Sequence, residues 1–364
     1  MKMLIGIDGN EANVKNRVGS GQFAFEVLKN LTRTDKKNTY KVYLKDKPLA
    51  DMPKEGKNLG YVSFGPQKLW TQFALPIRLF LGQRPDIFFS PSHYAPRFAP
   101  CPTVITIFDL SYIFFPNLFR KSDLYQLDNW TRYSLIRASA IITISESSKK
   151  DISYHYNISS DKVFVSYPGY GRLLYKPESE DKVEKIKKKY RIDGDYLFYL
   201  GTIQPRKNLI SLMNVLEELN DIKLVISGKK GWLYDEFFEK AQMMRDKIKI
   251  IDFAPLEDLP ALYSGAKAFV LPSLYEGFGI PVLEAMACGC PVVISNVSSL
   301  PEVGGMAAVY VDPTSEKSIR EGILKVINNP ERAKELSELG LKQAKKFSWE
   351  KCAEQVLKVL ESVS

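Results

Sequence analysis

Histidine and cysteine are scarce in this chain, which has two histidines and four cysteines among its 364 residues. His93 and His155 are too few to build a histidine-based metal site or a catalytic triad. The cysteines are too few and too scattered for a disulfide framework. Only one residue separates Cys288 from Cys290, whereas redox and zinc pairs usually have two between them. We therefore expect reduced thiols in a cytoplasmic protein.

Long hydrophobic runs are also missing. No apolar run approaches the length of a membrane span, and the run Met3–Ile7 is too short for the core of a secretory signal. The formal net charge of +9 favours acidic partners, either nucleotide phosphates or the anionic face of a bilayer. No nucleic-acid recognition module accompanies this charge, so nucleic acid is not an expected partner. We expect a cytoplasmic location, and association with the inner face of the membrane stays open.

Short apolar segments alternate with helical patterns along the chain. The first apolar segment, Met3–Ile7, is followed by the loop Gly19-Ser20-Gly21 and a helical pattern over 22–31. Further candidates for buried strands are 40–44, 87–89, 103–107, 140–144, 196–200, 223–226, 248–251, 268–271 and 291–294. This alternation favours mostly parallel sheets with helices on both faces, and predicts an α/β chain with two doubly wound, Rossmann-like domains.

A domain boundary is expected after the apolar segment that ends at Val165. The loop Tyr167–Gly171 and a lysine-rich stretch over 181–189 follow it, and the lysines are typical of a solvated helix face. We predict an N-terminal domain over 1–170 and a C-terminal domain over 171–346. The last segment, 347–364, has the pattern of one amphipathic helix, which we expect to pack back on the first domain.

The strongest functional signal lies in the last third of the chain. Glu276 and Glu284 stand on either side of Gly277-Phe278-Gly279. Pro281 and Gly289 mark the expected first residue and the end of a helix. Small residues let backbone amides approach a phosphate or a sugar, and a helix N-terminus favours an anion. The simpler alternative is an ordinary strand, turn and helix, in which Glu284 complements the helix dipole.

Two adjacent cations, Arg206 and Lys207, follow another candidate strand. Cations oppose the dipole at the start of a helix, and a bound diphosphate would account for them there. Arginine can bind it through two parallel hydrogen bonds, and lysine acts as a mobile point charge. A solvated helix start is the alternative. Because ligands of doubly wound domains bind at the carboxyl ends of the strands, a cleft between the two domains is the expected site.

These motifs together resemble the family four glycosyltransferases, also called group 1, which have the two-domain GT-B fold. The resemblance rests on Glu276 and Glu284 with seven residues between them, on Arg206-Lys207-Asn208 after Gly201, and on the loop Gly19–Gly21. It runs nearly end to end. It implies transfer of a sugar from a nucleotide diphosphate donor, with retention at the anomeric carbon. The implied acceptor is a glycan or a lipid-linked molecule in the synthesis of a cell-surface polysaccharide or glycolipid.

The resemblance also implies roles for individual residues. The implied catalytic residues are Glu276, Arg206 and Lys207, and the implied donor-binding residues are Glu284, Gly277, Phe278, Gly279, Gly19, Gly21, Phe108, Asp109 and Phe253. Glu284 is expected to bind the ribose hydroxyls, whereas Glu276 is expected to hold the donor sugar. The two cations are expected to neutralise the departing diphosphate, which is charge stabilisation without a metal ion. Neither a metal nor another cofactor is expected.

Phe108 departs from the family pattern, in which a histidine commonly precedes the aspartate that here is Asp109. In the family this histidine lies near the outer hydroxyls of the donor sugar. An apolar ring cannot donate a hydrogen bond to a hydroxyl. We hypothesise a donor without a 6-hydroxyl, such as a 6-deoxyhexose, and a tolerated substitution is the alternative. The implied enzyme is a hexosyltransferase, either a mannosyltransferase or a 6-deoxyhexosyltransferase.

The acceptor side is expected in the first domain, where 68–80 and 114–120 mix aromatic residues with cations. Such helical stretches suit contact with an anionic membrane, and core helices with extended cations are the alternative. A sugar-nucleotide hydrolase or epimerase of the same fold and a catalytically degenerate nucleotide-sugar-binding protein also remain open. A nicotinamide oxidoreductase is disfavoured, because Phe23-Ala24 lies where the third glycine of the dinucleotide motif would be.

Overall fold

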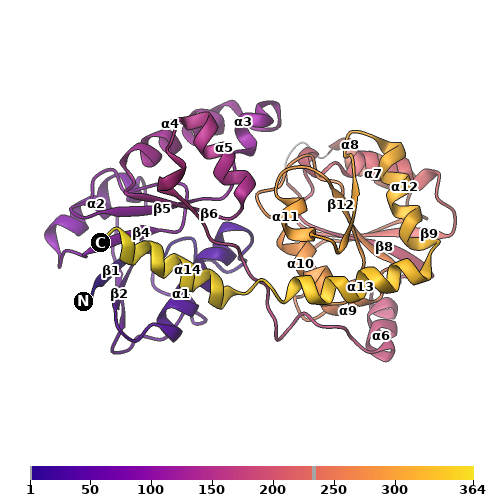
Figure 1. Ribbon diagram of the computed structural model, residues 1–364, viewed down its shortest axis with the longest axis horizontal. Helices are drawn as coiled ribbons and strands as arrows, with labels where there is room; N and C mark the ends of the chain where they lie inside the picture. The colour runs from indigo at the N-terminus through magenta and orange to yellow at the C-terminus, as the bar shows by residue number, and fades with distance from the viewer. Residues whose placement is uncertain (1, 232–234) are drawn as a thin grey trace. The chain divides into compact units, whose positions relative to one another are not determined.

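The computed structural model describes residues 2–231 and 235–364, which form two compact α/β units (Figure 1). Unit 1 comprises Met1–Gly169 and Ser348–Ser364, and unit 2 comprises Tyr170–Phe347. Each unit is built around one parallel sheet. The predicted α/β class with two Rossmann-like domains is confirmed.

Unit 1 has a seven-stranded sheet in the order β3-β2-β1-β4-β5-β6-β7, with every neighbouring pair parallel. The strands are β1 (Leu4–Asp8), β2 (Thr39–Leu44), β3 (Leu59–Ser63), β4 (Ile87–Ser90), β5 (Thr103–Ile107), β6 (Ala140–Thr143) and β7 (Val163–Val165). The helices are α1 (Ser20–Thr34), η1 (Trp70–Ala74), α2 (Leu75–Leu81), α3 (Ser111–Phe114), η2 (Pro116–Leu118), α4 (Lys121–Arg137), α5 (Glu146–Tyr156), η3 (Ser160–Lys162) and α14 (Trp349–Ser362). Helices α1 and α14 lie on one side of the sheet, and α4 and α5 on the other (Figure 1).

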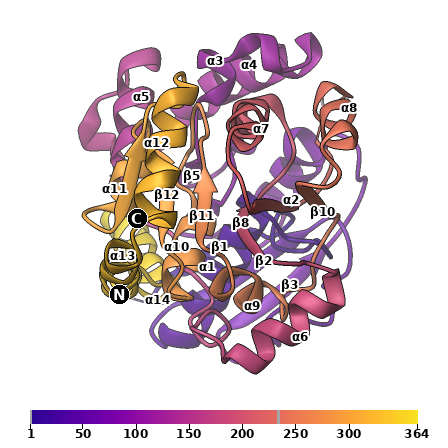
Figure 2. The same cartoon turned by 90° about the vertical axis from the view of Figure 1, so that its right-hand side faces the viewer.

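Unit 2 has a six-stranded sheet in the order β10-β9-β8-β11-β12-β13, again with every neighbouring pair parallel. The strands are β8 (Asp195–Leu200), β9 (Ile222–Ser227), β10 (Ile248–Ile251), β11 (Ala268–Leu271), β12 (Val292–Ser295) and β13 (Ala308–Val311). The helices are α6 (Glu180–Tyr190), η4 (Pro205–Lys207), α7 (Leu209–Glu217), α8 (Asp235–Met243), α9 (Leu259–Ser264), α10 (Ile280–Ala287), α11 (Leu300–Gly304), α12 (Glu316–Ile327) and α13 (Pro330–Ala344). Figure 2 shows α7, α8 and α12 on one side of this sheet and α9 and α10 on the other.

The central strands of both sheets are continuous apolar runs because helices cover both of their faces. Every residue of β4, β5, β6, β11 and β12 is buried. This is the pattern expected for parallel strands inside a doubly wound sheet. Among these strands, β5 leads into Phe108 and Asp109, and β11 leads into the loop that carries Glu276.

The C-terminal helix α14 belongs to unit 1, where it packs along α1. The Ser348 hydroxyl caps it by accepting a hydrogen bond from the amide of Lys351 at 3.1 Å. Gly169 lies directly against this start, because a Cβ at this glycine would be 2.2 Å from the backbone nitrogen of Trp349. Only a residue without a side chain fits where the two segments meet.

The structure differs from the sequence predictions in three places. Strands β3 and β13, which lie at an edge of each sheet, were not predicted. Gly60 and Ser63 interrupt the apolar pattern of β3, whereas all four residues of β13 are apolar. Residues 68–80 are not one regular helix, since Leu69 has a φ of 52° and the π-helical η1 precedes α2. Within 114–120, only η2 and the last residue of α3 are helical.

Among the described residues, no helix has both the length and the apolar character needed to cross a membrane.

Candidate functional site

The loop between β11 and α10 presents the two glutamates from different backbone settings. Gly279 caps α10 with a φ of 103°, and a Cβ there would lie 2.9 Å from Leu300 Cδ2, so glycine suits both its conformation and its surroundings. Pro281 is the second residue of α10, one later than predicted, and Gly289 follows the helix end with a φ of 73°. Glu284 therefore lies in the second turn of the helix, and Glu276 lies in the loop before it.

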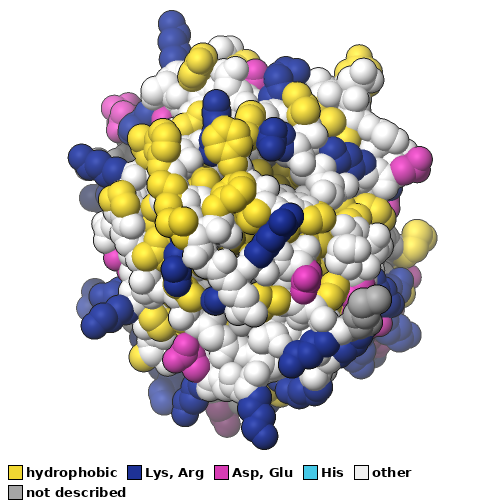
Figure 3. Space-filling model, turned by 90° about the vertical axis from the view of Figure 1, so that its left-hand side faces the viewer, with side chains coloured by type: hydrophobic (Ala, Val, Ile, Leu, Met, Phe, Trp, Pro, Cys, Tyr) yellow, Lys and Arg dark blue, Asp and Glu magenta, His cyan; other side chains and the backbone are white. Residues whose placement is uncertain are grey.

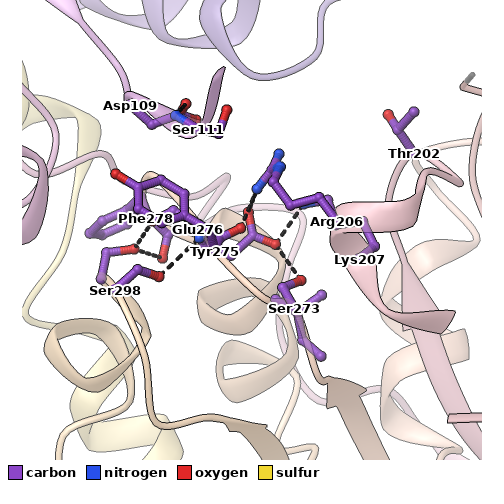
Figure 4. A network of polar contacts seen from close by, with 12 residues as sticks. Asp109, Ser111, Thr202, Arg206, Lys207, Ser273, Tyr275, Glu276, Phe278 and Ser298 are labelled. Carbon is purple, nitrogen blue, oxygen red and sulfur yellow. Dashed lines mark hydrogen bonds and ion pairs between the residues drawn. The ribbon is translucent and has the colours of Figure 1, made fainter. Parts of the chain in front are cut away.

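Glu276 is buried in a network of polar contacts, with 6% of its surface exposed (Figure 4). Its Oε1 accepts hydrogen bonds from Lys207 Nζ at 2.6 Å and from Ser273 Oγ at 2.7 Å. Its Oε2 accepts from Arg206 Nη1 at 3.4 Å. Its amide donates to Ser298 Oγ at 2.9 Å. The side chain and the backbone of Glu276 are thus both fixed.

The charge state of Glu276 follows from these neighbours. Burial by itself raises the pKa of a carboxyl group, but Lys207 and then Arg206 favour the charged form of Glu276. The hydrogen bonds from Lys207 and Ser273 act in the same direction, and the pKa falls to about 2. Glu276 is therefore ionised throughout the physiological pH range.

Arg206 and Lys207 lie in η4, which follows β8, and their side chains are each 13% exposed. Strands β8 and β11 are parallel neighbours, so their carboxyl ends bring the cations and Glu276 to one edge of the sheet. Arg206 also donates to the carbonyl of Tyr275. Two cations and one carboxylate leave one unit of positive charge here, which suits a diphosphate. The sequence predicted that all three residues contact a ligand. It did not predict that Glu276 pairs with Arg206 and Lys207.

Glu284 has surroundings of a different kind. Its Oε2 accepts a hydrogen bond from the hydroxyl of Tyr263 at 3.1 Å, and Tyr263 is fully buried in α9. Burial raises the pKa of Glu284 to about 7, and hydrogen bonds from Tyr175 and Tyr263 limit this rise. Glu284 is thus a hydrogen-bonding group whose charge changes near neutral pH.

Phe253 follows β10 in unit 2, where 49% of its surface is exposed. The ammonium of Lys229 lies 5.3 Å from the centre of its ring. An exposed ring beside a cation offers a flat surface on which a nucleobase can stack. The implied role of Phe253 in binding the donor remains a prediction.

The remaining predicted residues lie in unit 1. Gly19 caps α1 with a φ of 51°, and a Cβ on Gly21 would lie 3.0 Å from the carbonyl oxygen of Glu11. Asp109 accepts a hydrogen bond from the amide of Ser111 at 2.9 Å. The ring of Phe108 packs edge-to-face against Phe23, at 5.3 Å between centroids, and is stacked with the ring of His93, at 5.7 Å.

A pocket of about 430 Å³ in unit 1 was not predicted. Its walls include Asp8 at the end of β1, Glu11 and His93 in loops and Trp130 on α4, which are far apart in the sequence, and also Phe108. Asp8 and His93 follow the candidate strands that end near residues 7 and 89. This position after a strand was the one indication of the pocket that the sequence contained. Among residues 2–231 and 235–364, no group of three or more His, Cys, Asp or Glu side chains could hold a metal ion.

Comparison with known proteins agrees with this geometry. The family model "Glycosyl transferases group 1" matches residues 182–343. O-antigen chain mannosyltransferase B of Escherichia coli is 34% identical over 279 residues, which are 74% of this chain and 73% of that enzyme. The chain belongs to the group 1 glycosyltransferases. A second relative, the serotype-specific mannosyltransferase WbdA of Escherichia coli, is 32% identical over 58% of this glycosyltransferase and 27% of that longer protein.

Solved structures give the same fold. HepE of Anabaena, in a complex with UDP-glucose, superposes with a TM-score of 0.78 at 16% identity, over 99% of this glycosyltransferase and 100% of that chain. At this identity, the likeness concerns the fold alone. Together with the two parallel sheets, it establishes the GT-B architecture.

Proposed function

We propose that this glycosyltransferase is a mannosyltransferase that builds a cell-surface polysaccharide or glycolipid. It transfers mannose from a nucleoside diphosphate donor to a glycan or lipid-linked acceptor, with retention at the anomeric carbon. The relatives named as O-antigen and serotype-specific mannosyltransferases support the sugar and the pathway class. The cluster of Glu276, Arg206 and Lys207 at the edge of the unit 2 sheet is the observation that carries the donor assignment.

The donor domain of the proposal is 171–346 and the acceptor domain is 1–170, with 347–364 as the helix that returns to the acceptor domain. Arg206 and Lys207 bind the diphosphate and stabilise the negative charge that develops when the bond to the sugar breaks. Glu276 holds a sugar hydroxyl together with the amides of Phe278 and Gly279. Glu284 binds the ribose, and Gly277 lets the loop approach the donor closely.

Metal independence is part of the proposal, because two side-chain cations provide the positive charge that a metal ion would otherwise supply. Gly19, Gly21 and Asp109 would complete the donor site from unit 1, and Phe108 would contact the sugar.

The cysteines in the described residues have no disulfide partner, which supports a cytoplasmic enzyme.

Product analysis with a panel of sugar nucleotides tests this function. We expect GDP-mannose to raise the melting temperature more than UDP-glucose or GDP-fucose, and to yield a product whose anomeric linkage, read by NMR, has the configuration of the donor. The rate should be unchanged by EDTA. A preference for GDP-fucose would favour the 6-deoxyhexose hypothesis for Phe108 over mannose. Free mannose, an epimerised nucleotide or an unchanged donor, with acceptors present, would indicate the hydrolase, epimerase or binding-protein alternative.

The structure of unit 1 also favours peripheral contact with an anionic membrane. Phe73, Ile77, Phe80 and Leu81 on η1 and α2 expose 60%, 57%, 60% and 79% of their surfaces. Figure 3 shows hydrophobic side chains gathered on one face of the molecule, with Lys and Arg side chains among and around them. Apolar side chains can enter the headgroup region while cations bind anionic lipids. We propose that this face binds the membrane where lipid-linked acceptors are found.

Vesicle sedimentation tests this contact. The protein should sediment with phosphatidylglycerol vesicles at low salt and much less with phosphatidylcholine vesicles. The double substitution Phe80→Ser and Leu81→Ser should weaken this binding by about tenfold, because it removes apolar burial. Tyr154→Ser is the matched control, since Tyr154 is 84% exposed on α5. Equal binding by the double variant and the control would contradict the assigned surface.

A further inference from the structure

Two tyrosines hold Glu284 from segments that carry none of the predicted site residues. Tyr263 lies in α9, and its hydroxyl donates to Glu284 Oε2 at 3.1 Å. Tyr175 lies in the first segment of unit 2, before α6, and its hydroxyl also donates a hydrogen bond to Glu284. Glu284 is therefore oriented from outside the loop that presents Glu276.

Packed aromatic rings fix the direction of both hydroxyls. The ring of Tyr263 lies edge-to-face with the ring of Phe198 in β8, at 5.0 Å between centroids, and Tyr263 is fully buried. The rings of Tyr175 and Tyr263 also meet edge-to-face, at 6.1 Å between centroids, and Tyr175 is 6% exposed. Buried rings in close packing have little rotational freedom, so their hydroxyls are held in place before any ligand binds.

The segment that carries Tyr175 is attached to the rest of unit 2. It turns at Gly171, whose carbonyl accepts hydrogen bonds from the amides of Leu174 and Tyr175, each at 2.9 Å. Further along, the amide of Glu178 donates to Ser264 Oγ at 3.1 Å. Ser264 is the last residue of α9, the helix that carries Tyr263. The two tyrosines thus belong to one connected piece of structure.

Both tyrosine hydroxyls keep their protons near neutral pH. Burial raises the pKa of Tyr175 and of Tyr263 well above the ordinary value, and the nearby carboxylate of Glu284 acts in the same direction. Cys288, which follows the end of α10, is also neutral, because burial raises the pKa of its thiol. The two hydroxyls therefore face Glu284 as neutral hydrogen-bond donors.

The hydrogen-bonding capacity of Glu284 leaves room for a ligand. An ionised carboxylate has about four positions at which it can accept a hydrogen bond. The hydroxyls of Tyr175 and Tyr263 take two of these positions. Glu284 itself is half-buried, so its carboxylate is not enclosed by the protein. The positions that remain match the adjacent 2′- and 3′-hydroxyls of a ribose.

We propose that Tyr175 and Tyr263 are positioning residues for the nucleotide. They hold the carboxylate of Glu284 so that its remaining acceptor positions face both ribose hydroxyls, and this selects a ribonucleotide over a 2′-deoxyribonucleotide. The inference rests on the proposed function, in which Glu284 binds the ribose, and adds the residues that make this contact selective. Both tyrosines act through Glu284 and need no contact with the nucleotide.

Calorimetric titration with GDP and with 2′-deoxy-GDP tests this role. The unaltered protein should bind GDP about tenfold more tightly than 2′-deoxy-GDP. Tyr175→Phe and Tyr263→Phe keep the packed rings and remove only the hydroxyls, and each should reduce this preference to about threefold. Tyr310→Phe removes a hydroxyl that donates to the carbonyl of Gly305 elsewhere in unit 2, and this control should keep the tenfold preference.

A double-substitution comparison separates positioning from a general structural role. Tyr175→Phe should weaken GDP binding by about threefold in the otherwise unaltered protein. In the Glu284→Ala variant it should cause no further loss, because the residue through which it acts is missing. An equal loss with and without Glu284 would overturn the proposal. An unchanged preference for GDP over 2′-deoxy-GDP in both phenylalanine variants would also overturn it.

A measurement without nucleotide distinguishes this inference from the proposed function. In a ¹³C NMR titration of labelled glutamate, the midpoint of the Glu284 carboxyl should rise above 7 in Tyr175→Phe and in Tyr263→Phe, because each loses a donor to the ionised form. It should stay near 7 in Tyr310→Phe. A midpoint that neither variant moves would show that the tyrosines do not hold Glu284. If the midpoint rose but the unaltered protein bound neither nucleotide, the nucleotide site and its ribose selection would be wrong, and the hold on Glu284 would stand.

Discussion

The two glutamates of the motif have the same side chain and opposite surroundings. Glu276 lies between Lys207 and Arg206, which bring its pKa to about 2 in spite of its burial. Glu284 lies eight positions later against tyrosine hydroxyls, and burial raises its pKa to about 7. One glutamate is a fixed charge, and the other is a hydrogen-bonding group close to its titration point.

This difference separates charge stabilisation from recognition within one motif. A carboxylate between two cations holds them in position and sets the net charge that a diphosphate meets. A carboxyl group held by tyrosine hydroxyls is oriented by neutral donors, and suits hydroxyls such as those of a ribose. Losing Glu276 should impair the chemical step, whereas losing Glu284 should impair nucleotide binding.

The largest effect is expected from Glu276→Ala. Removal of this carboxylate releases Arg206 and Lys207 from their fixed positions, so kcat should fall by roughly 10²–10³ while nucleotide affinity changes by less than about threefold. Steady-state kinetics and calorimetric titration of the nucleotide measure the two quantities. Glu335→Ala, on the exposed face of α13, is the control and should match the unaltered enzyme. A loss of nucleotide affinity as large as the loss of kcat would contradict the different roles assigned to Glu276 and Glu284.

The pH dependence of stability should have opposite signs at the two sites. From pH 4.5 to about 7, Glu284 is protonated in the native state and ionised in the unfolded state, so its stabilising contribution falls as pH rises. The contribution of Glu276 is complete above pH 4.5 and is lost as pH falls toward 2.

Urea denaturation at several pH values measures these contributions. Relative to Glu284→Gln, the free energy of unfolding of the unaltered protein should decrease by at most about 3 kcal/mol as pH rises through this window. Relative to Glu276→Gln, it should instead decrease as the pH is lowered below 4.5. If the difference in the free energy of unfolding between the unaltered protein and Glu284→Gln stayed constant or rose with pH, the raised pKa of Glu284 would be contradicted.

A smaller effect is expected from Glu284→Ala. Loss of one pair of hydrogen bonds to the ribose should weaken nucleotide binding by about tenfold, with kcat at saturating donor nearly unchanged. Calorimetric titration of the nucleoside diphosphate measures the affinity, and the same Glu335→Ala variant is the control. Unchanged affinity would assign the ribose to another residue.

The motif itself was predictable because its signals are local. Pro281, Gly279 and Gly289 set the limits of one short helix through backbone preferences that hold in any fold. The central strands were predictable for a similar reason, since burial on both faces requires unbroken apolar runs. Strand β3 was not predicted because Gly60 and Ser63 interrupt its apolar pattern. Strand β13 was not predicted either, and its four apolar residues offer no such reason.

The pairing of Glu276 with Lys207 and the pocket of unit 1 depend on non-local structure. Lys207 and Glu276 meet because β8 and β11 are neighbours, although β9 and β10 lie between them in the sequence. His93 was set aside as one of only two histidines, yet its hydrogen bond to Phe108 arises from the adjacent strands β4 and β5. Strand order decides these contacts, and no spacing of residues along the chain reveals it.

The most direct test of the opposite states of the two glutamates is a titration of their side-chain carboxyl carbons by ¹³C NMR. Labelled glutamate is incorporated, and the two signals are assigned from Glu276→Gln and Glu284→Gln. From about pH 9 down to about pH 3, the Glu276 signal should keep the shift of an ionised carboxylate, whereas the Glu284 signal should move with a midpoint near 7. Two signals that both titrated near the ordinary value of 4.5, or in the reverse order, would contradict the account.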